Sequence, residues 1–241
     1  MRDRHPGLLW CSASAVAVAM ASTVHAGWAS VVVNGAETSI HSVNMPNLLS
    51  DPGNVFSNAD VDALHDSLNN GGVDTLGYLT MVLAETARGT SLVLLTDGPG
   101  TPITVPNDSL LGVEAVWDGT DTSLINLDGG GSWTVTDIGG GTQVGAGAMQ
   151  WLHEWSYEAL TITELSQGQS VMMNMYDLGM VDMYEQVLQL VSFTQSDEWS
   201  VLSTYSFNEE STITANTTIL AVPVPMTIAL LAMAGLRRRR R

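Results

Sequence analysis

Ten short segments between residues 30 and 220 are rich in apolar, β-branched and aromatic side chains, and Gly, Asn and Asp residues bound them. Runs of that length and composition are typical of β-strands. The predicted strands cover residues 30–33, 76–83, 91–96, 111–117, 132–136, 159–165, 170–176, 185–193, 199–207 and 211–220. A chain of about 195 residues can bury a substantial core. We therefore predict one all-β domain over residues 27–221, a single antiparallel β-sandwich of the jelly-roll or Greek-key type.

Two connections in the second half of this domain have the length of hairpin loops, at residues 166–169 and 195–198. Short connections join neighbouring antiparallel strands. We expect the strands on either side of each connection to pair in a meander or a Greek key.

One helix is expected within the strand pattern, over residues 58–68. Ser57 can cap its first turn, and Asp60 follows at the spacing of a capping box. Val61, Leu64 and Leu68 fall on one face, and an Asn-Asn-Gly-Gly sequence at 69–72 ends the helix.

Large apolar side chains on the predicted strands are expected to fill the core. Met172, Met173 and Met175 adjoin or alternate within one strand, which favours packing over copper binding. Four isolated tryptophans on or beside strands are expected to pack in the core or at its edge; they are Trp28, Trp117, Trp133 and Trp199.

The charge of the predicted domain is strongly one-sided. Residues 27–221 contain 24 acidic side chains and one basic side chain, Arg88, so the net charge is 24 minus 1, or −23. The whole chain has no lysine. Such a charge repels nucleic acid and anionic membrane surfaces, which excludes nucleic acid as an expected partner, and it keeps a protein soluble.

The first 26 residues have the three parts of an export signal. Arg2 and Arg4 precede an apolar stretch at 8–21, and the small-residue sequence Val24-His25-Ala26 follows. We predict cleavage between Ala26 and Gly27. The single cysteine, Cys11, lies inside the signal, so the mature chain has no disulfide bond.

The C-terminal twenty residues have the features of a second targeting signal; residues 1–26 and 222–241 are called the address segments below. The sequence Pro223-Val224-Pro225 precedes an apolar run at 226–236, and five arginines close the chain: Arg237, Arg238, Arg239, Arg240 and Arg241. At about 1.5 Å per residue, the apolar run covers only about half of a bilayer core of about 30 Å, which favours a transient membrane stop. Basic residues behind the run stay on the cytoplasmic side.

This tail, residues 222–241, resembles the PEP-CTERM sorting signal, with Val224 in place of the usual glutamate. The resemblance implies export, recognition by an exosortase-type membrane protease at the Pro-x-Pro motif, trimming, and association with the cell envelope or exopolysaccharide. A simple tail anchor without a processing protease is the alternative.

An aromatic segment is the best candidate for a recognition surface. In a strand over residues 151–158, alternation places Trp151, His153, Trp155 and Tyr157 on one face. Aromatic strips of this kind can stack on sugar rings, so Trp151, Trp155 and Tyr157 are candidate exopolysaccharide contacts. Burial of the same rings in the core is the competing interpretation.

Calcium is the one metal that the composition suggests. Asp51, Asn58, Asp60 and Asp62 surround the predicted helix start, but neither way of aligning them to a calcium loop gives a full ligand set. The alternative is an ordinary capped acidic helix. The acidic turns at 118–121 and 128–131 are further candidates, and turn chemistry alone also explains them.

No catalytic motif accompanies these features. His153-Glu154 begins like a zinc-binding helix, but Tyr157 stands where the second histidine is required. We therefore predict a non-catalytic, exported cell-surface or matrix protein with a structural or adhesive role. A carbohydrate-binding module is the alternative, followed by a secreted glycoside hydrolase.

Overall fold

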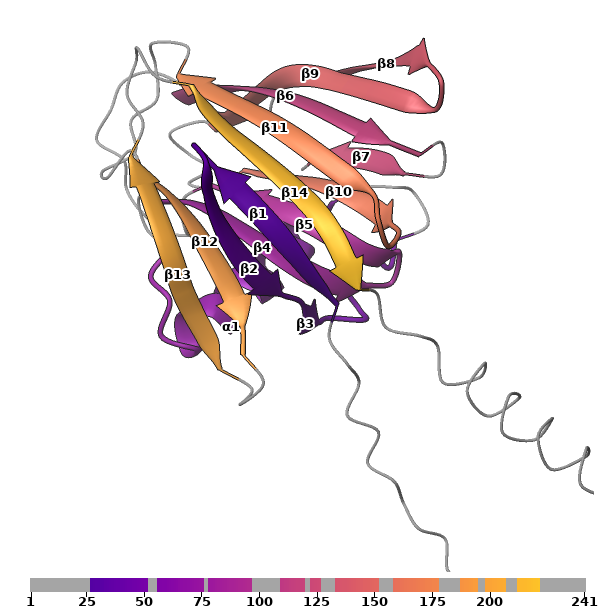
Figure 1. Ribbon diagram of the computed structural model, residues 1–241. Coiled ribbons are helices and arrows are strands. Elements are labelled where there is room, and N and C mark those ends of the chain that lie inside the picture. The colour runs from indigo at the N-terminus through magenta and orange to yellow at the C-terminus, as the bar shows by residue number, and fades with distance from the viewer. Residues whose placement is uncertain are drawn as a thin grey trace, which may run out of the picture.

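Two β-sheets face each other in the computed structural model, and one helix packs on the outside of one of them (Figure 1). The structure describes residues 27–51, 56–75, 78–96, 109–119, 122–126, 133–151, 158–177, 187–194, 198–206 and 212–221. The prediction of an all-β sandwich with one short helix is confirmed.

The first sheet, called the open sheet below, has seven strands. In spatial order they are β2 (Ala36–His41), β1 (Trp28–Val33), β14 (Ile213–Ala221), β11 (Ser170–Asp177), β6 (Ser109–Asp118), β9 (Thr142–Trp151) and β8 (Trp133–Gly139). All of its neighbouring strands are antiparallel.

The second sheet, called the covered sheet, also has seven strands. Six run in the order β13 (Trp199–Ser206), β12 (Val187–Phe193), β4 (Tyr78–Thr86), β5 (Gly89–Leu95), β10 (Ala159–Leu165) and β7 (Ser123–Asn126). The seventh, β3 (Val43–Asn44), shares an edge of β4 with β12, and both of them run parallel to β4. The expectation of a wholly antiparallel sandwich was wrong at these two pairs.

The central strands of the covered sheet are buried on both faces. In β4, Leu79, Met81 and Leu83 point into the main core between the sheets. Val82 and Ala84 point the other way, into a second core under the helix. Because strand side chains alternate in direction, burial of both faces requires an unbroken apolar run, as the sequence of β4 provides.

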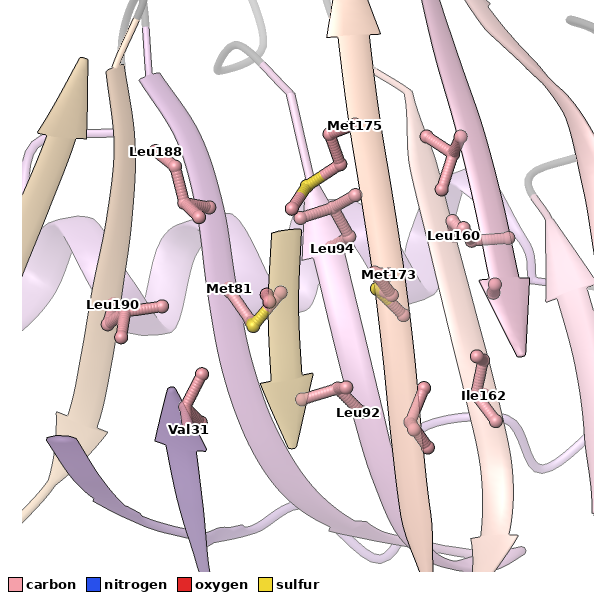
Figure 2. Close-up of a cluster of buried hydrophobic side chains, with 14 of the residues drawn as sticks. Val31, Met81, Leu92, Leu94, Leu160, Ile162, Met173, Met175, Leu188 and Leu190 are labelled. Atoms are coloured by element: carbon pink, nitrogen blue, oxygen red, sulfur yellow. The ribbon is translucent and has the colours of Figure 1, made fainter. Parts of the chain in front are cut away.

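The main core joins the two sheets directly. Figure 2 shows Met81, Leu92 and Leu94 of the covered sheet gathered with Met173 and Met175 of the open sheet. The expectation that methionines of this strand fill the core is confirmed for Met173 and Met175. Their neighbour Met172 is half-buried on the outer face, as alternation requires.

Two of the four tryptophans that were expected to pack are almost fully buried. Trp117 lies in the main core and Trp199 in the second core. Trp133 is half-buried and packs against the main core, and Trp28 is half-buried at the start of β1. These positions agree with the prediction of core or edge packing.

The helix α1 (Asn58–Asn70) closes the second core. Ser57 accepts a hydrogen bond from the Asp60 backbone N–H while Asp60 accepts one from the Ser57 N–H, so the predicted capping box is confirmed. Val61, Leu64 and Leu68 are buried against the covered sheet. His65 is buried on the same face, and burial lowers its pKa to about 4.

Four strands were missed by the prediction: β2, β3, β7 and β9. The signal for β2 is the dipeptide Asn34-Gly35, with φ of 49° and 83°, because such residues form the tight turn of a hairpin. Strand β9 contains a Gly-Ala-Gly-Ala run at residues 145–148 that disfavours a strand, and it forms because β6 and β8 pair with it on both sides. Its Gly145 lies against the ring of Trp117, where a larger residue would collide.

The connection at residues 166–169 is not a hairpin. It joins β10 of the covered sheet to β11 of the open sheet, so it turns a corner between the layers. The Gln169 side chain fixes this corner, because its amide nitrogen donates to the Asp118 carbonyl (2.7 Å) and the Thr122 hydroxyl (3.2 Å). Its carbonyl oxygen accepts from the Ser166 N–H. By contrast β12 and β13 do pair antiparallel, as predicted.

We expect Gln169→Ala to lower the free energy of unfolding by roughly 1–3 kcal/mol, because it leaves three polar groups of the corner without their partner. Gln167→Ala, in the same turn but exposed, should change it by less than about 0.5 kcal/mol. Equilibrium urea unfolding measures both. Equal effects of the two substitutions would contradict the role assigned to Gln169.

Candidate functional surfaces

The two ends of the described chain lie side by side. Trp28, at the start of β1, is paired in register with Ala221, at the end of β14 (Figure 1). Ala26 lies outside the described residues, and so do Pro223, Val224, Pro225 and the arginines Arg237 to Arg241. Both predicted address segments therefore attach at one end of the sandwich, called the terminal end below.

A half-buried carboxyl at the terminal end, with one oxygen fully buried, was missed by sequence reasoning. Burial raises the pKa of Glu85. Three groups that approach the carboxyl partly oppose this rise: the hydroxyls of Ser42 and Thr90 and the backbone N–H of Gly27. Thr90 Oγ1 donates to Glu85 Oε2 over 3.0 Å. Oε1 is buried and receives no hydrogen bond of normal length and angle from the residues that the structure describes.

A second buried carboxyl lies at the opposite end. Glu158 is only 3% exposed, and it precedes β10. Its backbone N–H donates to Thr96 Oγ1 (2.8 Å), and its carbonyl accepts from the Thr96 N–H (2.9 Å). Burial raises the pKa of its carboxyl to about 8, a shift that the N–H of Ala159 partly opposes. The group is therefore mostly uncharged at neutral pH.

These two carboxyls cannot act as an acid pair. Glu85 is paired with Thr90, and Glu158 contacts Thr96, six residues further along the same stretch of chain. At about 3.3 Å per residue this separation is about 20 Å. Glycosidase acid pairs lie about 5–9.5 Å apart. The two carboxyls with raised pKa therefore occupy separate sites.

The predicted aromatic strip lies mostly outside the described residues. Trp151 is the last residue of β9, opposite Ser109 of β6. His153, Trp155 and Tyr157 fall in the segment 152–157, which is not described. Whether these rings form a stripe therefore stays a prediction. The described residue that follows them is the buried Glu158.

The flanks of this aromatic segment lie at the end opposite the termini, called the far end below. The ladder from β14 through β11 and β6 places Ile213, at the start of β14, level with Gly147 of β9, and Trp151 lies four residues further in the direction away from Ala221. Ala221 is eight residues beyond Ile213 along β14, or about 26 Å away. The aromatic segment is therefore attached at the far end.

The predicted calcium ligands do not act together in the described structure. The Asp60 carboxylate accepts from Ser57 and from the Leu49 N–H (3.2 Å), which is the capping role named as the alternative. Asn58, Asp62 and Asp51 are exposed. No group of three or more His, Cys, Asp or Glu side chains that could hold a metal ion occurs in the described ranges.

The outer face of the open sheet carries a shallow groove of about 260 Å³ over β6, β11 and β14. Apolar and polar side chains share its lining, which comprises Val116, Trp117, Asp118, Ser170, Val171, Met172, Asn216 and Thr218. Further along the same face the exposed ring of Tyr176 lies over Gly112, where no larger residue would fit. This face offers an aromatic ring and amide groups to solvent.

Comparisons with family models, curated proteins and solved structures give no match to this chain. Within the described ranges, no helix is long and apolar enough to span a bilayer.

Replacing Glu158 by Gln should flatten the pH dependence of stability. In the unfolded chain the carboxyl ionises near its ordinary pKa of 4.5, but in the folded protein it ionises only near 8. Folding thus favours the protonated carboxyl. The contribution of this group to the free energy of unfolding is complete below pH 4.5 and is lost as the pH rises to 8.

At pH 8.5 we expect the free energy of unfolding of Glu158→Gln to exceed that of the unsubstituted protein by up to a few kcal/mol. This difference should vanish near pH 4. Urea titrations at several pH values give this profile. The exposed Glu198→Gln serves as the control. A Glu158→Gln advantage that is the same at every pH would contradict the assignment.

Proposed function

We propose that this chain is an exported protein of the cell envelope or extracellular matrix, with a structural or adhesive role and no catalysis. The observation that carries the proposal is the pairing of Trp28 with Ala221, which brings both address segments to one end of the sandwich. A protein that is first held by its N-terminal signal and then by its C-terminal tail must present both ends to the same membrane.

The charge of the domain supports the same orientation. Between the two addresses the chain carries 24 acidic side chains and one arginine. Anionic headgroups repel such a domain, so only the apolar tail with its arginines favours the membrane. The sandwich then extends away from the bilayer, and trimming of the tail by an exosortase-type protease releases it to the envelope or matrix.

The test is the intact mass and location of the protein in an exosortase-bearing host. We expect the unsubstituted chain to lose the residues beyond about Pro225, and a Pro223→Ala, Pro225→Ala double variant to keep them. Val224→Glu, which restores the residue usual in the sorting signal, is the matched control and should be trimmed. An intact C-terminus in all three would mean a tail anchor without processing.

The alternative function is a module that binds exopolysaccharide. It is favoured by the described flanks of the aromatic segment, Trp151 and Glu158, which lie at the far end, about 20 Å or more from the terminal end. A matrix polymer outside the cell meets that end first. Trp155 and Tyr157 would supply the rings for stacking on sugars.

Binding of the purified protein to the host's exopolysaccharide, by co-sedimentation, tests this alternative. Trp155→Ala combined with Tyr157→Ala should weaken binding by at least roughly tenfold if these rings stack on sugar. Tyr176→Ala, which removes an exposed ring from the outer face of the open sheet, should leave it unchanged. The reverse pattern would assign binding to the open sheet instead.

A further inference from the structure

Residue 27 is closely packed at the terminal end against Ser42, Glu85 and Ala221. Gly27 is buried, and its carbonyl accepts a hydrogen bond from the Ser42 N–H over 2.8 Å. A Cβ atom on it would lie 2.5 Å from Glu85 Oε1 and 3.0 Å from the Ala221 carbonyl oxygen. The backbone of Gly27 is therefore in direct contact with the Glu85 carboxyl.

Among the described residues, no charged side chain acts on the Glu85 carboxyl to balance it. One oxygen accepts from Thr90, while Oε1 is buried with no hydrogen bond of normal geometry from the described residues. The neighbouring Ser42 Oγ is in the same condition. A buried carboxylate with an open acceptor and a hydroxyl beside it is suited to a small cation with several N–H donors.

The backbone nitrogen of Gly27 is the donor that approaches this carboxyl. In the uncleaved chain it is a neutral amide with one hydrogen. Hydrolysis of the Ala26–Gly27 bond adds one water, leaving a carboxylate on Ala26 and a primary amine on Gly27. That amine takes up a proton at neutral pH, since α-amino groups have a pKa of about 8.

We propose that Glu85 is the receptor for the α-ammonium group of processed Gly27, so that removal of the export signal completes a buried ion pair. The inference rests on the proposed export and adds a consequence to it. The pair joins the start of β1 to β4, and Ser42 Oγ accepts a further hydrogen bond from the ammonium. Cleavage thereby fastens the first strand of the domain after translocation.

The chain offers an unusually direct test, because it has no lysine and the processed N-terminus is its only primary amine. The exported, purified protein is treated at pH 7.5 with an N-hydroxysuccinimide ester of acetic acid, and intact mass follows the reaction. A single acetyl group per chain reports the Gly27 amine alone.

We expect the folded protein to react about eightfold more slowly than the urea-unfolded protein, because an ion pair that raises the amine pKa from about 8 to about 9 lowers the reactive free base at pH 7.5 by that factor. Glu85→Gln should restore fast acetylation, whereas the exposed Glu198→Gln should not. Forced acetylation, done in urea before refolding, should lower the Tm of the unsubstituted protein. Comparing the Tm of the acetylated and unacetylated protein needs no substitution, so this test remains if Glu85→Gln fails to fold.

The outcomes separate this inference from the proposed function. A mature chain that begins at Gly27, reacts at the unfolded rate and keeps its Tm after acetylation overturns the ion pair and leaves export intact. A mass that shows another first residue, or an uncleaved signal, overturns the ion pair together with the predicted cleavage site.

Discussion

The fold depends on a sheet that is buried on both of its faces. Side chains of β4 and β5 alternate between the main core and the second core, so these two strands support the open sheet on one side and α1 on the other. Hydrophobic burial is the dominant favourable term in folding, and it scales with the apolar area removed from water. With two cores sharing its central strands, the covered sheet couples the helix to the sandwich.

Burial in the folded domain also shifts the pKa of titratable side chains. The domain has a large excess of acidic side chains, and burying an ionised carboxylate without a partner is costly. Two buried titratable side chains of the described residues are held largely uncharged at neutral pH, because burial raises the pKa of Glu158 to about 8 and lowers that of His65 to about 4. Glu85 combines burial with a location beside the first residue of the predicted mature chain.

Sequence patterns found most strands and the helix because local physics specifies them. Apolar runs bounded by turn residues located β4, β5, β6, β10, β11 and β12, and Ser57 with Asp60 located the helix start. The polar edge strand β2 and the glycine-rich β9 were missed, since pairing with neighbours, not side-chain preference, stabilises them. The corner at residues 166–169 has the length of a hairpin, so length alone could not show that it passes between sheets.

By itself the sequence determined where polar and apolar side chains alternate, the helix cap, the one-sided charge and the two expected address segments. These properties depend on the composition of the chain and on residues close together in the sequence, so the sequence alone is enough to predict them. Only the tertiary structure decided that Trp28 pairs with Ala221, that Trp151 is attached at the far end, and that Glu85 meets Gly27. Each is a contact between residues distant in the chain, and burial and strand register, which no local pattern carries, bring them together.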